Sequence, residues 1–443
     1  MNVAAGARWD LRWRRQRAVT VEEPIGVGRV QEPVEITLDV ASQTPEEFVR
    51  SLRVVARDPG TGELTEIPSQ VVNVRAAYGG ISASILFEAT VPAHSTRDFL
   101  VCYDNPSAEA PAYPSALAVR APASGLGYDI RTAHVEATLD PKSGQMATFQ
   151  PLGTPAPRFN YRSDPVHWTP DVVPAPPRQS YYNVRRWDPP ARVKITTGSL
   201  AAIVERSGPL AFSAAAGDTE DPGVPEVEVS ITYGFHASEP YVVQTSAITT
   251  LEDVELHTIR NGGELTYGPG NFTHAVWEDE SGELMGLPLG GMADRDIDAR
   301  HGGRIPATVP WFSFVNRDAG TGMAVLYLRY ENLNPRLHSG LAPIHNDGIW
   351  IYSAVEGDFY FRAPIWEYAL YDRERSPAVL VPAGSLYYER NAWLPFEFAG
   401  NDFEAVRAVS RRLRNPLRAS YAARDDREIR NMPETSVMPV PIR

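Results

Sequence analysis

Apolar and polar residues alternate along much of the chain, the pattern of a β-strand with one buried face. Residues 34–40 alternate without a break. Comparable runs lie at residues 82–90, 98–103, 227–235, 322–330, 348–355 and 385–394. Turn-forming clusters such as Asp58-Pro59-Gly60 separate these runs, and no helical segments come between them. The pattern therefore predicts an all-β fold built from antiparallel sheets.

One segment has helical spacing instead, at residues 402–414. Its apolar residues fall on one helical face, and they are Phe403, Val406, Val409 and Leu413. Asn401 precedes the segment as a cap, and Pro416 follows it as a stop. We expect a single substantial helix there, near the end of the fold.

Composition along the chain predicts three parts. Residues 105–125 are rich in Pro, Ala and Ser, as linkers are. We expect an N-terminal β-sandwich over residues 1–120, then a large antiparallel β-supersandwich over residues 121–400 that carries the catalytic site. Residues 401–443 form the C-terminal helix and tail. The proline-rich residues 155–190 exclude an α-helix and predict a long irregular loop.

Charge and cysteine content exclude several classes of protein. The 443 residues carry 42 Lys plus Arg against 55 Asp plus Glu, a net charge of −13, which argues against nucleic acid as a partner. No apolar run is long enough to span a membrane. Cys102 is the only cysteine, which excludes an intramolecular disulfide and predicts a buried, inert thiol. The N-terminus has no apolar signal region and predicts a cytoplasmic protein, although a secreted chain with its leader removed would look the same. The sequence does not give the oligomeric state, and a homo-oligomer is one of the alternatives.

No recognised nucleotide, zinc-protease or serine-hydrolase motif is present, so the side chains themselves supply the candidates. His274 shares a predicted strand with Glu278, and His167 lies in the proline-rich loop. Arg329 and Tyr330 are adjacent in another strand. Elimination from a uronic acid needs a His or Tyr base and a cation to neutralise the substrate carboxylate, and these residues would supply both.

Aromatic side chains are a second signal, because sugar rings pack their C–H faces on aromatic rings. We expect substrate contacts from four aromatic residues and one histidine: Trp168, Tyr181, Trp187, Trp277 and His345. The alternative is that these rings belong to the hydrophobic core. One divalent metal ion could be held by two or three of His236, His257 and His274 with Glu278, but the spacing does not require it.

The stretch from His134 to Met146 combines a strand with a D-x-x-x-G turn formed by Asp140 and Gly144. It resembles the opening strand pair of galactose-mutarotase-like β-supersandwiches, which occur in polysaccharide lyases, sugar epimerases and the C-terminal parts of some α-mannosidases. The paired runs 233–236 and 241–244 are similar to long strands of that family. The resemblance covers about residues 125–400 and implies a carbohydrate-binding concave face. It assigns no catalytic residue.

These observations favour a carbohydrate-active enzyme, with a lyase that cleaves uronic-acid-containing saccharides by β-elimination as the leading interpretation. The first alternative is a glycoside hydrolase that uses paired carboxylates, whose separation the sequence does not give. The second alternative is a non-catalytic sugar-binding accessory subunit.

Overall fold

The computed structural model describes residues 9–41, 43–77, 79–154, 159–160, 170–175, 182–211, 225–267, 272–289, 305–306, 308–343, 350–354, 357–365 and 378–421. Every strand pairing within these residues is antiparallel. Two α-helices lie within the described ranges. The predicted all-β fold with one C-terminal helix is confirmed.

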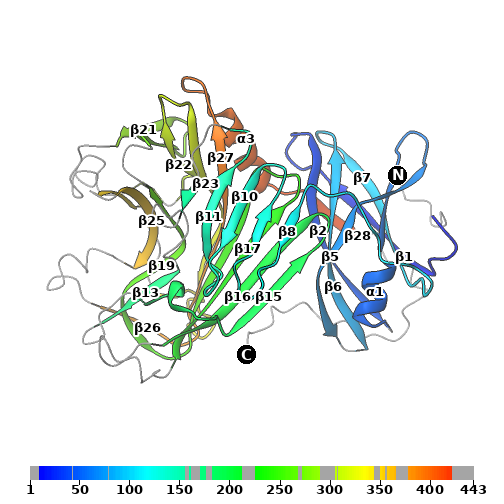
Figure 1. The fold of residues 1–443 in the computed structure, drawn as a ribbon, viewed down its shortest axis with the longest axis horizontal. Helices are drawn as coiled ribbons and strands as arrows, with labels where there is room; N and C mark the ends of the chain where they lie inside the picture. Colours follow the sequence, from blue (N-terminus) through cyan, green and yellow to red (C-terminus); the bar gives the residue numbers. More distant parts are fainter. Residues whose placement is uncertain are drawn as a thin grey trace.

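The N-terminal part is a sandwich of two sheets, drawn in blue in Figure 1 except for β28, which comes from the end of the described chain and is orange-red. The first sheet has the order β28 (Arg418–Tyr421), β1 (Arg15–Glu22), β7 (Thr96–Tyr103), β3 (Arg53–Arg57) and β4 (Leu64–Ile67). The second has the order β2 (Arg29–Ala41), β6 (Gly80–Val91) and β5 (Ser69–Ala77). Buried residues of both sheets, among them Val21, Phe87 and Val101, form one core. The alternating pattern of residues 34–40 thus marks the strand whose apolar face lies in this core.

A nine-stranded sheet dominates the rest of the chain. Its order is β15 (Arg192–Thr197), β16 (Ala201–Ala211), β17 (Pro225–His236), β18 (Val242–Thr250), β27 (Leu386–Glu397), β23 (Thr321–Leu333), β22 (Trp311–Asn316), β20 (His274–Glu278) and β21 (Leu284–Pro288). We call the face that shares a core with the smaller sheets the inner face, and the opposite one the outer face.

Two smaller sheets pack toward the inner face. One has the order β12 (Phe159–Asn160), β11 (Met146–Pro151), β10 (Val135–Leu139), β9 (Asp129–Arg131) and β8 (Ala118–Arg120). The other has the order β14 (Tyr182–Asn183), β13 (Asp171–Pro174), β19 (Val254–Tyr267), β25 (Gly357–Ile365) and β24 (Trp350–Ala354), with β26 (Val379–Val381) also paired to β19.

The D-x-x-x-G turn joins β10 to β11, as the sequence predicts. The Asp140 carboxylate accepts hydrogen bonds from the backbone N–H groups of Lys142 and Ser143, at 3.0 and 2.7 Å. Gly144 has a φ of +67°, a conformation that favours glycine. The Arg206 guanidinium is fully buried behind this turn and donates to the Ser143 carbonyl oxygen at 2.9 Å. The turn therefore anchors the small sheet to the inner face through Arg206.

The predicted helix is α3 (Glu404–Arg414), which covers part of the outer face. Phe403 at its N-cap stacks on Trp311, with ring centroids 5.8 Å apart. Asn401 was the expected cap, but the N-cap position is Phe403, and Asp402 instead accepts from the Glu404 N–H at 3.0 Å. After α3 the chain enters the N-terminal sandwich, where β28 pairs with β1 (Figure 1). The three expected parts and the two boundaries between them stay a prediction.

Two local expectations need correction. Residues 155–190 were expected to form a loop without secondary structure, but β13 lies in this segment, pairs with β19 and buries Val172 and Val173. A short helix, α1 (Pro45–Ser51), was not expected. Thr44 and Glu47 form a capping box at its start, and Phe48 is fully buried. Within the described ranges, no helix combines the length and apolar character needed to cross a bilayer.

We predict that Cys102 is chemically silent. The thiol lies in β7 and is 1% exposed, and burial raises its pKa to about 12. Cys102→Ala should lower the free energy of unfolding by at most ~1–2 kcal/mol, because only a small buried side chain is truncated. Denaturant unfolding measures this loss, and a thiol reagent should label the native protein only at the rate of unfolding. Fast labelling of the native protein would contradict the burial of β7.

Candidate functional site

An apolar row crosses the inner face of the nine-stranded sheet. Directly opposed residues on successive strands from β16 to β20 are Ala202, Phe235, Val242, Trp393, Val325, Phe312 and Trp277. All seven are buried in the same hydrophobic core. A continuous row of apolar residues is typical of a buried sheet face, and the next rows differ from it in polarity.

The two rows beside it are polar at the centre of the sheet. The first contains Gln244, Asn391 and Tyr327, and the second contains Ser246, Glu389 and Tyr330. We call these six residues the polar patch. Tyr330 is half-buried and the other five are buried, with Glu389 only 1% exposed. Buried polar groups of this kind cost free energy unless they are hydrogen-bonded, so their partners decide what the patch is for.

Gln244 is held in one orientation by Trp393. The indole Nε1 donates to Gln244 Oε1 at 3.0 Å. Because an indole N–H only donates, it fixes the amide oxygen on its own side and leaves Gln244 Nε2 on the other. That nitrogen is buried and has no hydrogen-bond partner among the described residues.

Asn391 is oriented in the same way by Glu389. Its Nδ2 donates to Glu389 Oε1 at 3.0 Å, which turns Asn391 Oδ1 away from the carboxylate. This oxygen is also buried without a partner in the described part of the chain. An unused donor and an unused acceptor thus lie on directly opposed residues of β18 and β27.

A third amide reaches the sheet from β19 in the opposing layer. Asn261 Nδ2 donates to the backbone carbonyl oxygen of Tyr387 at 2.9 Å, and it lies 3.5 Å from that of Ser246. Asn261 Oδ1 is buried and unpaired in the residues described. The patch and Asn261 together therefore combine a carboxylate, two phenol hydroxyls, a serine hydroxyl and three amides, and each amide has one buried polar atom without a partner among the described residues.

Such an arrangement suits a ligand rich in hydroxyl groups. A hydroxyl both donates and accepts, so it can satisfy Gln244 Nε2 and either of the free amide oxygens. Glu389 is the single carboxylate of the patch, and a carboxylate buried among hydrogen-bonding groups is a candidate for proton transfer.

Glu278, one of the expected catalytic residues, lies in an ion pair with α3 and outside the polar patch. Its Oε2 atom accepts from Arg407 Nε of α3 at 2.6 Å and lies 3.3 Å from Trp311 Nε1. Glu278 lies on the outer face, where this ion pair ties α3 to β20. A structural role accounts for all of these contacts.

The two described tryptophans of the expected substrate site are in the core. Trp277 is buried in the apolar row and stacks on Phe312, with centroids 6.5 Å apart. Trp187 is buried, and its Nε1 donates to the Pro209 carbonyl oxygen at 3.1 Å. These positions match the alternative interpretation, in which the rings are core residues.

His274 is not brought together with Arg329 and Tyr330. His274 is level with Gly322 of β23 through Val315, and Arg329 lies seven residues further along that strand, roughly 20 Å away at ~3.3 Å per residue. His274 Nδ1 lies 3.0 Å from Thr273 Oγ1, and burial together with the Arg317 charge lowers the pKa of His274. Arg329 is exposed and pairs with Glu331 at 2.6 Å.

Tyr330 is the one expected catalytic residue that lies in the polar patch, directly opposite Glu389. A register shift between Tyr327 and Arg329 puts Leu328 out of step, so Tyr327 and Tyr330 both oppose inner-face residues. His167, Trp168, Tyr181 and His345 lie outside the described residues, and their roles stay predictions. Within the described ranges, no three His, Cys, Asp or Glu side chains gather as metal ligands.

The sequence matches no protein-family model and no curated protein. Two solved structures from Enterococcus faecalis have a similar fold. One is a protein in glycosyl hydrolase family 38, with a TM-score of 0.52 and 12% identity over 94% of this chain. The other is an α-mannosidase from strain V583, with a TM-score of 0.53 and 12% identity over 92% of this chain. This chain spans about half of those chains, 48% and 46%. The likeness supports the sandwich architecture, while the galactose-mutarotase-like assignment stays a prediction.

We predict that Glu278 stabilises the fold and takes no part in ligand binding. Glu278→Ala should lower the free energy of unfolding by about 1–2 kcal/mol, because the Arg407 side chain is 30% exposed and solvent screens the lost ion pair. Glu283→Ala in the same hairpin removes an exposed carboxylate and serves as the control. Denaturant unfolding of the three proteins measures the difference. A Glu278→Ala protein of unchanged stability with altered saccharide binding would instead place Glu278 in the functional site.

Proposed function

We propose that this chain is a carbohydrate-active protein that binds a saccharide at the polar patch and acts as a glycoside hydrolase, with Glu389 as its acid–base carboxylate. The observation that carries the proposal is the set of buried amide atoms without partners around that carboxylate: Gln244 Nε2, Asn391 Oδ1 and Asn261 Oδ1.

Saccharides fit this set better than purely apolar ligands. Sugar hydroxyls supply the missing donors and acceptors, and the rings of Tyr327 and Tyr330 offer apolar surfaces with polar tips. A ligand without hydroxyl groups would leave the three amides unsatisfied in a buried site, which disfavours its binding. The same groups that are costly in the free protein thereby become the source of specificity.

Hydrolysis is favoured over elimination by two observations. The residues that would serve a lyase, His274 and Arg329, lie far apart along the sheet. The two solved structures of similar fold are described as a glycosyl hydrolase family 38 protein and an α-mannosidase. Hydrolysis commonly uses two carboxyl groups, and the patch supplies one. Glu356 and Glu367 are sequence candidates for the second, and both lie outside the described residues.

A second function, saccharide binding without turnover, is favoured by one specific observation. The polar patch contains a single carboxylate, Glu389, whereas hydrolysis commonly uses two. A binding module would use the same amides and aromatic hydroxyls as the hydrolase. The two functions are therefore separated by turnover and not by affinity.

We predict that Glu389→Gln abolishes hydrolysis while saccharide binding persists. The amide keeps the shape and the hydrogen bond to Asn391 but does not transfer protons, so kcat should fall at least ~100-fold. Glu331→Gln, which changes a carboxylate on the outer face two residues from Arg329, should leave kcat unchanged. The assay is reducing-end release from mannosides and a panel of neutral and uronate oligosaccharides, with binding followed by calorimetry.

The other results of this assay would change the proposed function in different ways. Full activity of Glu389→Gln would remove Glu389 from the mechanism. Binding by the wild-type protein without turnover on the whole panel would favour the accessory function. Release of an unsaturated, ultraviolet-absorbing product from uronates would return the assignment to a lyase. Absence of both binding and turnover would overturn the saccharide proposal itself.

A further inference from the structure

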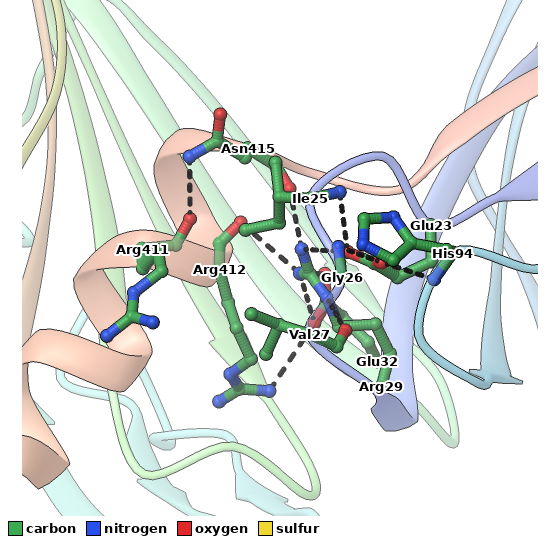
Figure 2. Close-up of polar contacts among 10 residues, drawn as sticks. All are labelled: Glu23, Ile25, Gly26, Val27, Arg29, Glu32, His94, Arg411, Arg412 and Asn415. Carbon is green, nitrogen blue, oxygen red and sulfur yellow. Dashed lines mark hydrogen bonds and ion pairs between the residues drawn. The ribbon is translucent and has the colours of Figure 1, made fainter.

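A buried cluster of charges lies where the N-terminal sandwich, α3 and the hairpin between β17 and β18 meet. Figure 2 shows most of it, with the guanidinium of Arg29 at the centre. The cluster contains three buried carboxylates, Glu23, Glu32 and Glu239, and two guanidiniums, Arg29 and Arg412. It is separate from the polar patch and plays no part in the proposed function.

Arg29 joins the sandwich to the end of α3. It is 1% exposed and pairs with Glu32 at 2.7 Å and with Glu23 at 3.2 Å. The same guanidinium donates to the carbonyl oxygens of Asn415 at 2.9 Å and Arg412 at 3.4 Å. A cation at these carbonyls also complements the negative end of the helix dipole.

Glu23 is fully satisfied within the sandwich. Burial alone would raise its pKa, but backbone N–H groups donate to its carboxylate and lower that pKa to about 2. The hydrogen bonds from Gly26 and His94 measure 2.6 and 3.0 Å. Glu23 therefore stays ionised at every ordinary pH.

Arg412 is shared by the two remaining carboxylates. Its Nη1 lies 3.4 Å from Glu32 Oε2, and its Nη2 lies 3.7 Å from Glu239 Oε2. Glu32 is already paired with Arg29 at a shorter distance. Among the described residues, Glu239 is paired only with Arg412, which it shares with Glu32 and from which it lies farther. Three negative charges against two positive charges leave the cluster with one carboxylate in excess when all are ionised.

We propose that Glu239 is a pH-sensitive latch: protonated, it lets the β17–β18 hairpin pack closely on α3 and the N-terminal sandwich, and ionised, it loosens that junction. The proposal follows from the excess carboxylate and from the place of Glu239 on the hairpin, across the junction from Arg412 of α3. Removing the excess charge by protonation costs little, because Arg412 keeps its pairing with Glu32.

The groups that surround Glu239 agree with this assignment. Burial raises the pKa of Glu239 to about 7, the Arg412 charge opposes the rise, and the charges of Glu32 and Glu88 add to it. Tyr241 hydrogen-bonds to Glu239, and burial keeps the pKa of this phenol far above neutrality. His236, three residues earlier, has a pKa lowered by burial to about 4, so it stays neutral between pH 5 and 8.

The sign of the effect follows from linkage. A carboxyl group whose pKa is higher in the closed state than in the open state binds its proton more tightly when closed. Its contribution to closure is complete below the ordinary pKa of 4.5 and disappears as pH rises through about 7. The junction should therefore be tighter at pH 5 than at pH 8. A shift from 4.5 to about 7 sets an upper limit of roughly 300-fold on the change in the opening equilibrium.

Hydrogen–deuterium exchange of the full chain tests the latch. After correction for intrinsic exchange, opening in peptides that cover residues 237–241 and 404–415 should increase at least tenfold from pH 5 to pH 8. Peptides from residues 322–330 in the sheet should not change. Glu239→Gln should be protected at both pH values. Glu404→Gln removes an exposed carboxylate from the same helix and should keep the wild-type pH dependence.

Three results of these exchange experiments would contradict the latch. Wild-type protein without a pH-dependent change at these peptides overturns the latch, whatever the variants do. A Glu239→Gln protein that keeps the wild-type pH dependence also overturns the proposal, because the change then does not come from Glu239. Where Glu239→Gln does not fold, Glu88→Gln serves instead and should move the midpoint to lower pH, because it removes one repelling charge. An unchanged midpoint in Glu88→Gln then contradicts the proposal.

Discussion

Polar side chains buried in the middle of a nine-stranded sheet impose the constraint on which the site depends. Every buried donor and acceptor needs a partner, and the sheet supplies only some of them. Trp393 satisfies one side of Gln244, and Glu389 satisfies one side of Asn391. The opposite sides of both amides remain without partners in the described chain. A hydroxyl-rich ligand bound beside the Glu389 carboxylate would supply the missing partners.

The scaffold brings these groups together by register. Gln244, Asn391 and Tyr327 are separated by long stretches of sequence and become neighbours only because β18, β27 and β23 pair in a fixed antiparallel order. The irregularity at Leu328 then allows both Tyr327 and Tyr330 to oppose inner-face residues. On the outer face, α3 and the Arg29 cluster hold the large sheet against the N-terminal sandwich.

Sequence patterns were sufficient for most of the fold and for little of the site. Period-two runs placed β2, β17 and β27, and the D-x-x-x-G turn placed the β10–β11 pair, because these signals are local. The capping box at Thr44 could have revealed α1 in the same way. Glu389 and Asn391 alternate with Tyr388 and Arg390, so both faces of β27 look polar and the pattern does not show which is buried. Aromatic content suggested binding at Trp277, which the register places in the core.

We propose that the partnerless amides beside Glu389 bind a saccharide. A crystal structure of the full chain grown with a neutral oligosaccharide tests it most directly. We predict sugar hydroxyls within hydrogen-bond distance of Gln244 Nε2 and Asn391 Oδ1, next to the Glu389 carboxylate. Saccharide bound only at another surface, with water or protein groups satisfying those two atoms, would contradict it.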